Sequence, residues 1–113
     1  MNWFWLMTIK WKKRAEAEYQ KYIVYCLDKF GHFATLRFLE KMDKQINLLE
    51  KFPHLGKVEP LLVGRCYNYR SLVVHPHFKL VYYINEAKER IVITNFWDVR
   101  REPRKLMEEV FGG

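Results

Sequence analysis

Residues 67–97 read YNYRSLVVHPHFKLVYYINEAKERIVITNFW. Three runs of β-branched and aromatic residues, at 67–74, 78–85 and 90–97, are separated by the turn sequences HPH and EAKE. Both separators are short enough for hairpins, so we expect three consecutive antiparallel strands. The middle run is apolar on both faces, which is typical of a central strand.

Two helices are predicted to precede these strands. Residues 12–30 carry apolar or small side chains at helical spacing, namely Ala15, Tyr19, Tyr22, Ile23, Cys26 and Phe30. Residues 33–51 repeat this spacing with Leu36, Leu39, Met42, Ile46 and Leu49. Gly31 lies between the two segments and can adopt the left-handed conformation that commonly ends a helix, and Pro53 ends the second segment. A turn this short predicts an antiparallel helical hairpin.

Two shorter elements complete the expected fold. Residues 7–11 (MTIKW) are rich in β-formers, and residues 102–111 can form a short C-terminal helix. Gly56, Pro60 and Gly64 indicate a loop with little regular structure. We therefore expect an α+β fold of order β-α-α-β-β-β-α, in which the hairpin packs on a twisted, mainly antiparallel four-stranded sheet.

The composition excludes two classes of protein. The chain has 113 residues, so we expect a single domain over residues 1–113. Half of the residues are hydrophobic and 17% are aromatic, which excludes an intrinsically disordered chain. Cys26 and Cys66 are the only cysteines, which excludes a disulfide-rich miniprotein. Both are read as reduced, apolar side chains.

The net charge is positive, because 20 Lys and Arg residues face 13 Asp and Glu residues, which gives +7. This surplus predicts attraction to an acidic partner such as nucleic acid, a ribosome or an acidic protein. A role in solubility alone is the alternative interpretation.

The N-terminal stretch WFWLM, at residues 3–7, is strongly apolar. It lacks the basic leader and the cleavage site of a signal peptide. It is also far shorter than the roughly 20 apolar residues that span a bilayer. Residues 1–6 are therefore read as an extension of the first strand or as an N-terminal addition, and we expect a cytoplasmic protein without a membrane partner.

Four segments resemble one family of proteins. They are the opening strand with the helix that follows it, the run LLEKFPHLG at 48–56, the pair YRSLVV and FKLVYY at 69–74 and 78–83, and the closing strand IVITNFWDVR at 91–100. In this order they resemble the RelE/ParE superfamily, the toxins of bacterial type II toxin–antitoxin systems of the plasmid-stabilisation type. The resemblance implies a growth-arresting toxin that a cognate antitoxin neutralises in a hetero-oligomer.

The resemblance implies two alternative targets. RelE-like members cleave messenger RNA on the ribosome, and ParE-like members poison DNA gyrase. The sequence favours ribosome-dependent cleavage without a metal or cofactor as the first hypothesis. A gyrase poison without enzymatic activity is the alternative, as is a degenerate member that binds its antitoxin or nucleic acid and is not toxic.

Metal-independent RNA cleavage needs a cation on the phosphate and groups that transfer protons. Arg70 is the first candidate, because it interrupts an apolar strand and matches the arginine that RelE-like enzymes place there. Arg100, after the last strand, resembles the basic residue at that position in the family. Lys79 and Tyr83 lie four residues apart and therefore share a face, where they could transfer protons beside Arg70. Structural roles for all four residues are the alternative.

The remaining candidates are weaker. Substrate-binding roles are predicted for four further basic residues, Lys51, Lys57, Arg65 and Arg101. The C-terminal His-Tyr pair of many RelE-like enzymes is missing, since residues 96–98 read FWD. The spacing His75-Pro76-His77 is used by metal sites, but the proline indicates a hairpin turn, so no metal is expected.

The antitoxin is predicted to fold onto the toxin as a helix or as an added strand. The helical hairpin and its apolar flank are candidates for the docking surface, together with Phe4, Trp5 and Trp97. Ordinary packing in the core is the alternative for these aromatic residues.

Overall fold

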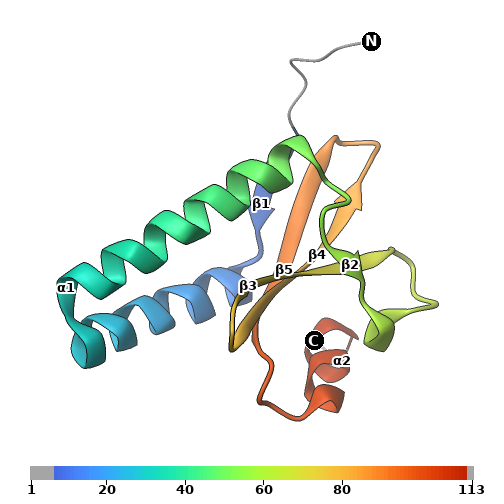
Figure 1. Cartoon of the computed structure of the whole chain (residues 1–113). Helices are drawn as coiled ribbons and strands as arrows, with labels where there is room; N and C mark the ends of the chain where they lie inside the picture. Colours follow the sequence, from blue (N-terminus) through green and yellow to red (C-terminus); the bar gives the residue numbers. More distant parts are fainter. Residues whose placement is uncertain (1–6, 112–113) are drawn as a thin grey trace.

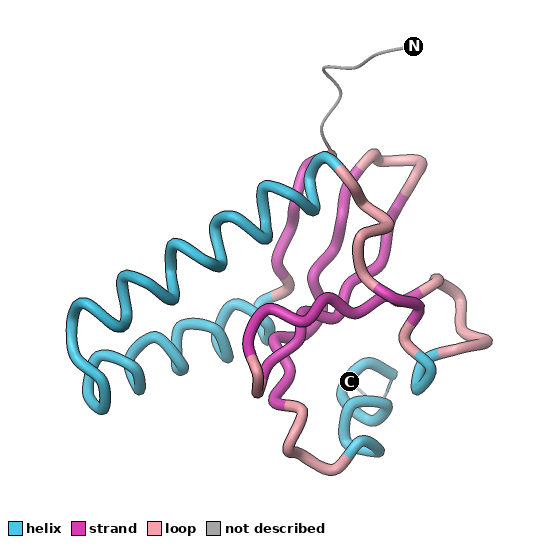
Figure 2. Tube along the Cα trace, in the orientation of Figure 1, coloured by secondary structure: helices cyan, strands magenta, loops and turns pink. Residues whose placement is uncertain are grey.

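The computed structural model describes residues 7–111. Its centre is one five-stranded sheet of order β1-β5-β4-β3-β2 (Figures 1 and 2). The strands are β1 (Thr8–Trp11), β2 (Lys57–Val58), β3 (Tyr69–His75), β4 (Phe78–Asn85) and β5 (Arg90–Asp98). β1 pairs with β5 in parallel, and the other pairs are antiparallel. The expected mainly antiparallel sheet is confirmed.

The sheet has one strand more than expected. β2 pairs Lys57 with Ser71 and Val58 with Arg70, in a segment predicted to be a loop. A strand of two residues is too short to show the alternation of apolar and polar side chains that indicates a strand in a sequence. The prediction of four strands was therefore wrong by this short edge strand.

The helical hairpin is confirmed. α1 (Lys13–Lys51) is one helical element that reverses at Gly31, where φ is 84° and ψ is −178°. Only glycine adopts this backbone conformation readily. The two arms run side by side, and the bend lies far from the sheet (Figure 2).

The hairpin covers one face of the sheet. Leu80, Tyr82, Ile91 and Ile93 are completely buried in the cluster that also contains Ala15, Phe38, Met42 and Leu49 of α1. Burial of each large apolar side chain contributes about 1.5–3 kcal/mol relative to exposure. The apolar stripes predicted for both arms therefore hold the hairpin on the sheet.

The short helices cover the opposite face. α2 (Pro103–Phe111) and the 3-10 helix at Pro60–Leu62 pack there, with Leu62 and Leu106 buried against Val81, Val92 and Trp97. In Figure 1 the hairpin and α2 lie on opposite sides of the strands. This arrangement explains why β4 is apolar at almost every position.

The connection from α1 to β2 is held by a buried tyrosine. The hydroxyl of Tyr82 donates to the carbonyl of Pro53 at 2.7 Å and accepts from the backbone N–H of Gly56 at 2.9 Å. Gly56 lies so close to β3 that a Cβ atom there would be 2.6 Å from the carbonyl oxygen of Ser71. The FPHLG segment therefore needs glycine at its last position.

Candidate functional site

Arg70 lies on β3, on the face of the sheet that the hairpin covers. It pairs with Tyr82 across the strands, and Nη1 donates to the carbonyl of Gly56 at 2.7 Å. Its side chain is half-buried. Arg70 therefore links β3 to the FPHLG segment.

Lys79 and Tyr83 lie on the opposite face of the sheet. The ammonium group of Lys79 is bonded to the carboxylate of Glu59, which is only 2% exposed and also accepts from the hydroxyl of Ser71 at 2.7 Å. Tyr83 is buried, and its ring stacks on Tyr67 with 3.8 Å between the centroids. The structure therefore does not bring these two residues together with Arg70.

The ionisation states of Glu59 and Tyr83 follow from their contacts. Burial alone would raise the pKa of Glu59, but hydrogen bonds from Lys79, Ser71 and the N–H of Leu61 lower it below its ordinary value. Burial raises the pKa of the Tyr83 hydroxyl, and the neighbouring Tyr67 raises it further. At neutral pH Lys79 is thus engaged with a carboxylate, and Tyr83 keeps its proton.

A β-bulge determines which face each residue occupies. The turn pairs His75 with Phe78, but the register then shifts, and Val73 pairs with Lys79. Without that shift, Lys79 would pair with Val74 and share a face with Arg70. One extra residue in a strand moves every later side chain to the other face.

Arg100 is held by Asp98 directly after β5. Its Nε and a terminal nitrogen each donate to the carboxylate at 2.9 Å, and its backbone N–H donates to the same carboxylate at 2.9 Å. Hydrogen bonds from Arg100 are the main cause that lowers the pKa of Asp98. A bidentate pair of this kind fixes the direction of the guanidinium group.

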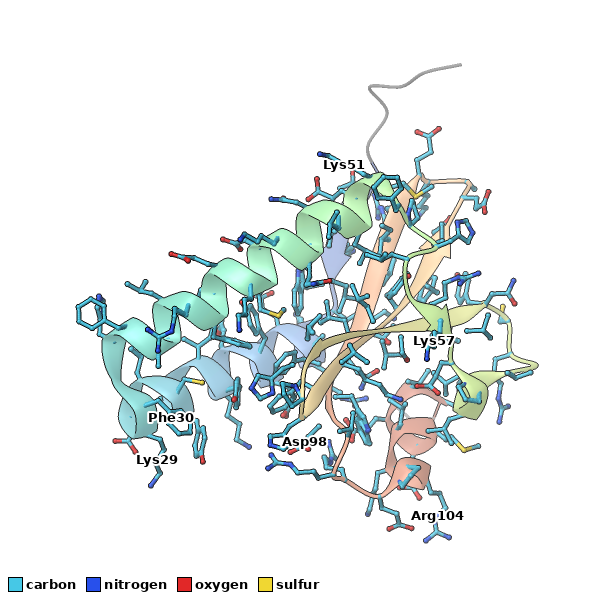
Figure 3. The ribbon with its side chains drawn as sticks, in the orientation of Figure 1. Lys29, Phe30, Lys51, Lys57, Asp98 and Arg104 are labelled. Carbon is cyan, nitrogen blue, oxygen red and sulfur yellow. The ribbon has the colours of Figure 1, made fainter. Side chains whose placement is uncertain are left out.

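The predicted substrate-binding residues lie in different places. Lys51 ends α1, and Lys57 lies on β2 (Figure 3). The guanidinium of Arg65 lies 4.2 Å above the ring of Phe111. Arg101 lies 4.3 Å above the ring of Trp97 and is paired with Glu109 at 2.6 Å. Arg101 lines one pocket together with Arg100, and the other three residues do not line it.

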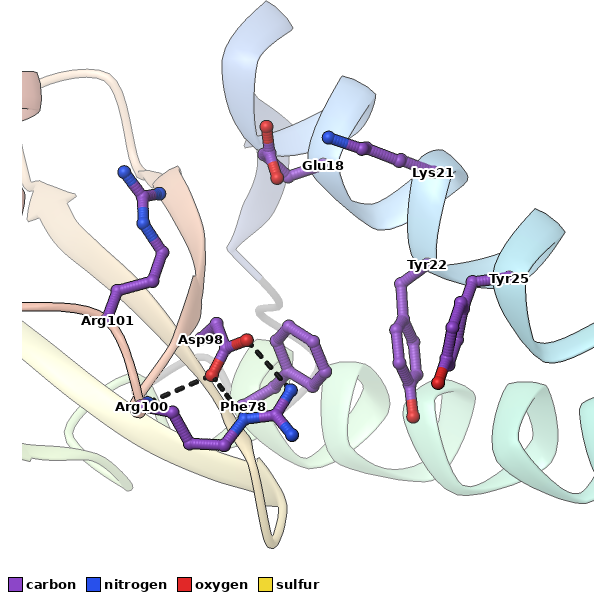
Figure 4. A pocket seen from close by; sticks show the side chains of 8 residues that line it. All are labelled: Glu18, Lys21, Tyr22, Tyr25, Phe78, Asp98, Arg100 and Arg101. Carbon is purple, nitrogen blue, oxygen red and sulfur yellow. Dashed lines mark hydrogen bonds and ion pairs between the residues drawn. The ribbon is translucent and has the colours of Figure 1, made fainter. Parts of the chain in front are cut away.

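That pocket is the candidate functional site. It has a volume of about 560 Å³ and opens between the first arm of α1 and the end of β5 (Figure 4). Its lining residues are Glu18, Lys21, Tyr22, Tyr25, Phe78, Asp98, Arg100 and Arg101. The rings of Tyr22 and Tyr25 are stacked, with 5.9 Å between their centroids. The pocket thus combines aromatic faces with guanidinium groups.

A histidine lies beside the pocket. His75 Nε2 is 3.4 Å from the hydroxyl of Tyr22, and the backbone N–H of His77 donates to His75 Nδ1 at 3.0 Å. Because Nδ1 accepts this bond, the neutral ring carries its proton on Nε2 and donates it to Tyr22. Burial raises the pKa of Tyr22 to about 12, so its hydroxyl stays protonated at neutral pH.

Sequence analysis did not identify Tyr22, Tyr25 and His75 as site residues. Tyr22 belongs to a helical stripe that indicated core packing, and His75 was expected in a turn, whereas it is the last residue of β3. These residues come together through the β4–β5 register. It pairs Phe78 with Asp98 and brings the N–H of Val99 to the carbonyl of His77 at 2.9 Å. This register places Arg100 near His75, the last residue of β3.

The pKa of His75 predicts a pH dependence of stability. Burial, His77, Arg100 and Lys41 lower this pKa below the ordinary histidine value. The unfolded chain therefore binds a proton before the folded chain does as the pH falls. We expect this contribution to the unfolding free energy to be fully present above about pH 6.5 and to be lost as the pH falls below that value. Urea unfolding between pH 5 and 7.5 measures the loss.

The variant His75→Gln tests whether His75 causes this pH dependence of stability. Without the imidazole, the unfolding free energy should fall less between pH 7 and pH 5 than in the unmodified protein. His54→Gln is the matched control, because it removes a histidine that lies exposed in the turn after α1. An identical pH profile for His75→Gln and the unmodified protein would contradict the prediction.

The described residues hold neither a metal-binding cluster nor a membrane-spanning helix. Within residues 7–111, no three His, Cys, Asp or Glu side chains come close enough to hold a metal ion. Over the same residues, no helix is long and apolar enough to cross a membrane.

Comparison with known proteins adds a family and a fold. Residues 9–103 match the family model described as the ParE toxin of the type II toxin–antitoxin system parDE. No curated protein sequence matches the chain.

Solved structures share the fold at low sequence identity. One from the chromosomal ParDE system of P. aeruginosa is 18% identical, with a TM-score of 0.64 over 83% of this chain and 97% of that chain. The YoeB/ParE toxin from Agrobacterium tumefaciens is 21% identical, with a TM-score of 0.57 over 81% and 98%. The YoeB dimer from Staphylococcus aureus is 18% identical, with a TM-score of 0.54 over 80% and 93%.

Proposed function

Because the chain belongs to the ParE toxin family of type II toxin–antitoxin systems, we propose that it arrests bacterial growth by binding DNA gyrase and that a cognate antitoxin neutralises it. The toxin then acts by binding its target and not by cleaving RNA. The residues first considered for RNA cleavage then have structural or recognition roles.

One observation carries this proposal. The sheet separates Arg70 from Lys79 and Tyr83, so a single phosphate cannot contact all three side chains. Lys79 is already paired with Glu59, and Arg70 donates to the carbonyl of Gly56. Proton transfer and charge stabilisation need groups within hydrogen-bond reach of the same reacting atoms. This separation supports binding over cleavage by that set of residues.

We expect induced expression without antitoxin to block DNA synthesis first. Labelled thymidine, uridine and amino acid incorporation would be followed over the first minutes after induction. Thymidine incorporation should fall well before amino acid incorporation, because a gyrase poison stops replication forks. The purified toxin should also inhibit supercoiling of relaxed plasmid by purified gyrase.

The matched control for this experiment is co-expression with the cognate antitoxin, which should restore all three incorporation rates. A collapse of amino acid incorporation before thymidine incorporation, with supercoiling unaffected, would reject gyrase as the target.

That opposite outcome would favour ribosome-dependent mRNA cleavage, the second candidate. It is supported by the pocket of about 560 Å³, which Tyr22 and Arg100 line and beside which His75 lies. Burial lowers the pKa of His75 and so favours the neutral imidazole, but a general base also needs a free ring nitrogen, so the N–H of His77 would have to leave Nδ1. Under this alternative, His75→Gln would remove growth arrest and leave the fold intact.

The antitoxin is proposed to dock on the outer half of the hairpin. Large apolar side chains are exposed there, including Val24 at 66%, Phe30 at 60% and Phe33 at 76%. Patches of this kind usually mark protein interfaces. Trp97, an initial candidate for this surface, is 2% exposed and packs beneath α2. Phe4 and Trp5 lie outside the described residues.

A further inference from the structure

Within residues 7–111, the short helices cover only part of the sheet face opposite the hairpin. In Figure 1, α2 lies at the bottom of the strands, whereas the turn between β4 and β5 lies at the top. We call the uncovered surface, formed by Lys10, Tyr67, Tyr83 and Arg90, the open sheet face. We propose that it binds a single-stranded nucleic acid. The proposal goes beyond the action on gyrase and does not depend on it.

The strand registers place these four side chains on one face. Val92 of β5 is buried in the cluster beneath α2, and it pairs with Lys10 on one side and with Tyr83 on the other. Arg90 precedes Val92 by two residues and therefore points to the same face. The ring of Tyr67 stacks on that of Tyr83. The open sheet face thus crosses the sheet, with cations on β1 and β5 and aromatic rings on β4 and just before β3.

The first argument is the guanidinium group of Arg90. This side chain is half-buried, and its Nε is buried and has no hydrogen-bond partner in the described part of the chain. Between residues 7 and 111, Arg90 also takes part in none of the ion pairs. An arginine nitrogen can only donate, and the group keeps its charge at physiological pH. A half-buried charged donor without a partner points to an anionic acceptor.

The second argument is a further cation beside Arg90. Lys10 is exposed and, over the same described residues, takes part in none of the ion pairs. It lies on β1, which pairs directly with the strand of Arg90. Neighbouring strands are about 4.8 Å apart, so the two charges can contact phosphates of the same strand of nucleic acid.

The third argument is the aromatic stack. Tyr83 is 8% exposed and supports Tyr67, which is 39% exposed, and the two ring planes are only 14° apart. A ring supported from beneath in this way offers a flat surface on which a base of any kind can stack. An acidic peptide could pair with Arg90, but it has no flat group that gains from the stack. The aromatic pair therefore favours a nucleic acid over an acidic peptide.

These contacts define how a strand would lie. It would cross the open sheet face from β1 toward β3, with phosphates at Lys10 and Arg90 and a base on the ring of Tyr67. Binding of this kind depends on the backbone and on stacking, so it tolerates any base sequence. Single-stranded DNA and RNA both offer these groups, and separate probes distinguish them.

The test is fluorescence anisotropy with the purified full-length protein at low ionic strength. The labelled probes are oligothymidylate, oligouridylate and an oligoglutamate peptide, each of about ten units. We expect saturable binding of the nucleic acids, with weaker binding of the peptide. Equal affinity for DNA and RNA assigns recognition to phosphates and bases, and tighter binding of RNA adds a contact to the 2′-hydroxyl. No saturable binding of either nucleic acid, or tighter binding of the peptide, would overturn the proposal.

Four variants make the test specific. Tyr67→Leu should weaken binding at least about fivefold, because it removes the stacking surface. Arg90→Gln should weaken it about tenfold. Lys10→Met should reduce the slope of log affinity against log salt concentration by about 0.7, the value for one lost phosphate contact. Lys44→Met is the charge-matched control, because Lys44 is exposed on the second arm of α1 and should leave the affinity unchanged.

Two of these variants alter only exposed side chains, so they test the site whatever Arg90→Gln does to stability. Equal losses in Lys10→Met and Lys44→Met, with unchanged affinity in Tyr67→Leu, would indicate diffuse attraction to a basic protein and would overturn the site. Supercoiling by gyrase is measured separately, so failure of this proposal and failure of the gyrase proposal are distinguishable.

Discussion

Replacement of Lys79 by methionine is expected to lower the free energy of unfolding by about 3–5 kcal/mol. The variant keeps the length and apolar character of the side-chain stem but removes the ammonium group from Glu59. That carboxylate is 2% exposed, so it would be left as a buried charge without its cationic partner. The hydroxyl of Ser71 and the N–H of Leu61 would remain bonded to it. Urea unfolding at pH 7 measures the effect.

Two further proteins control this prediction. Lys88→Met removes an exposed lysine from the turn between β4 and β5 and should change stability by less than about 0.5 kcal/mol. The double variant Glu59→Gln/Lys79→Met should recover most of the loss, because the buried charge is gone. A loss below about 1 kcal/mol for Lys79→Met alone would contradict the role of this ion pair.

Replacement of Gly56 by alanine is expected to cost about 2–3 kcal/mol, although it adds a single methyl group. The new Cβ would lie 2.6 Å from the carbonyl oxygen of Ser71 and 2.9 Å from Cε1 of Tyr82. A backbone atom cannot move aside as a flexible side chain can, so β2 must shift away from β3. The hydrogen bonds from Gly56 to Tyr82 and from Arg70 to Gly56 would be strained as well. Thermal unfolding of the purified variant tests this.

Gly64→Ala is the matched control for the clash. Gly64 has a φ of 83° and no heavy atom within 4 Å of a Cβ built there. Alanine at that position should therefore cost only the strain of the left-handed backbone, about 1 kcal/mol. If Gly56→Ala proved no more destabilising than Gly64→Ala, the close approach to β3 would not be the reason for glycine at position 56.

The elements with strong local patterns were predictable. The apolar positions of both arms recur every three or four residues, and Gly31 separates the arms, so the hairpin follows from the sequence. The turns HPH and EAKE also indicate the order of β3, β4 and β5. β2 was missed because two residues show no period.

The candidate sites were much less predictable. Arg100 was a candidate because it follows the last strand and resembles the family's basic residue there. Its neighbours Tyr22 and His75 come from α1 and from the end of β3, 53 residues apart in the sequence. Contacts between distant segments depend on register and packing, which a single sequence does not reveal.

The amino-acid sequence by itself determined the helical hairpin, the three antiparallel strands and the resemblance to toxins of type II toxin–antitoxin systems, because each depends on local periodicity, turns and motif order. Only the tertiary structure decided which side chains share a face. The shift of register between Val73 and His75 turns Lys79 and Tyr83 away from Arg70. Side chains alternate with a period of two residues, so one residue in a bulge is enough to separate groups that the sequence places together.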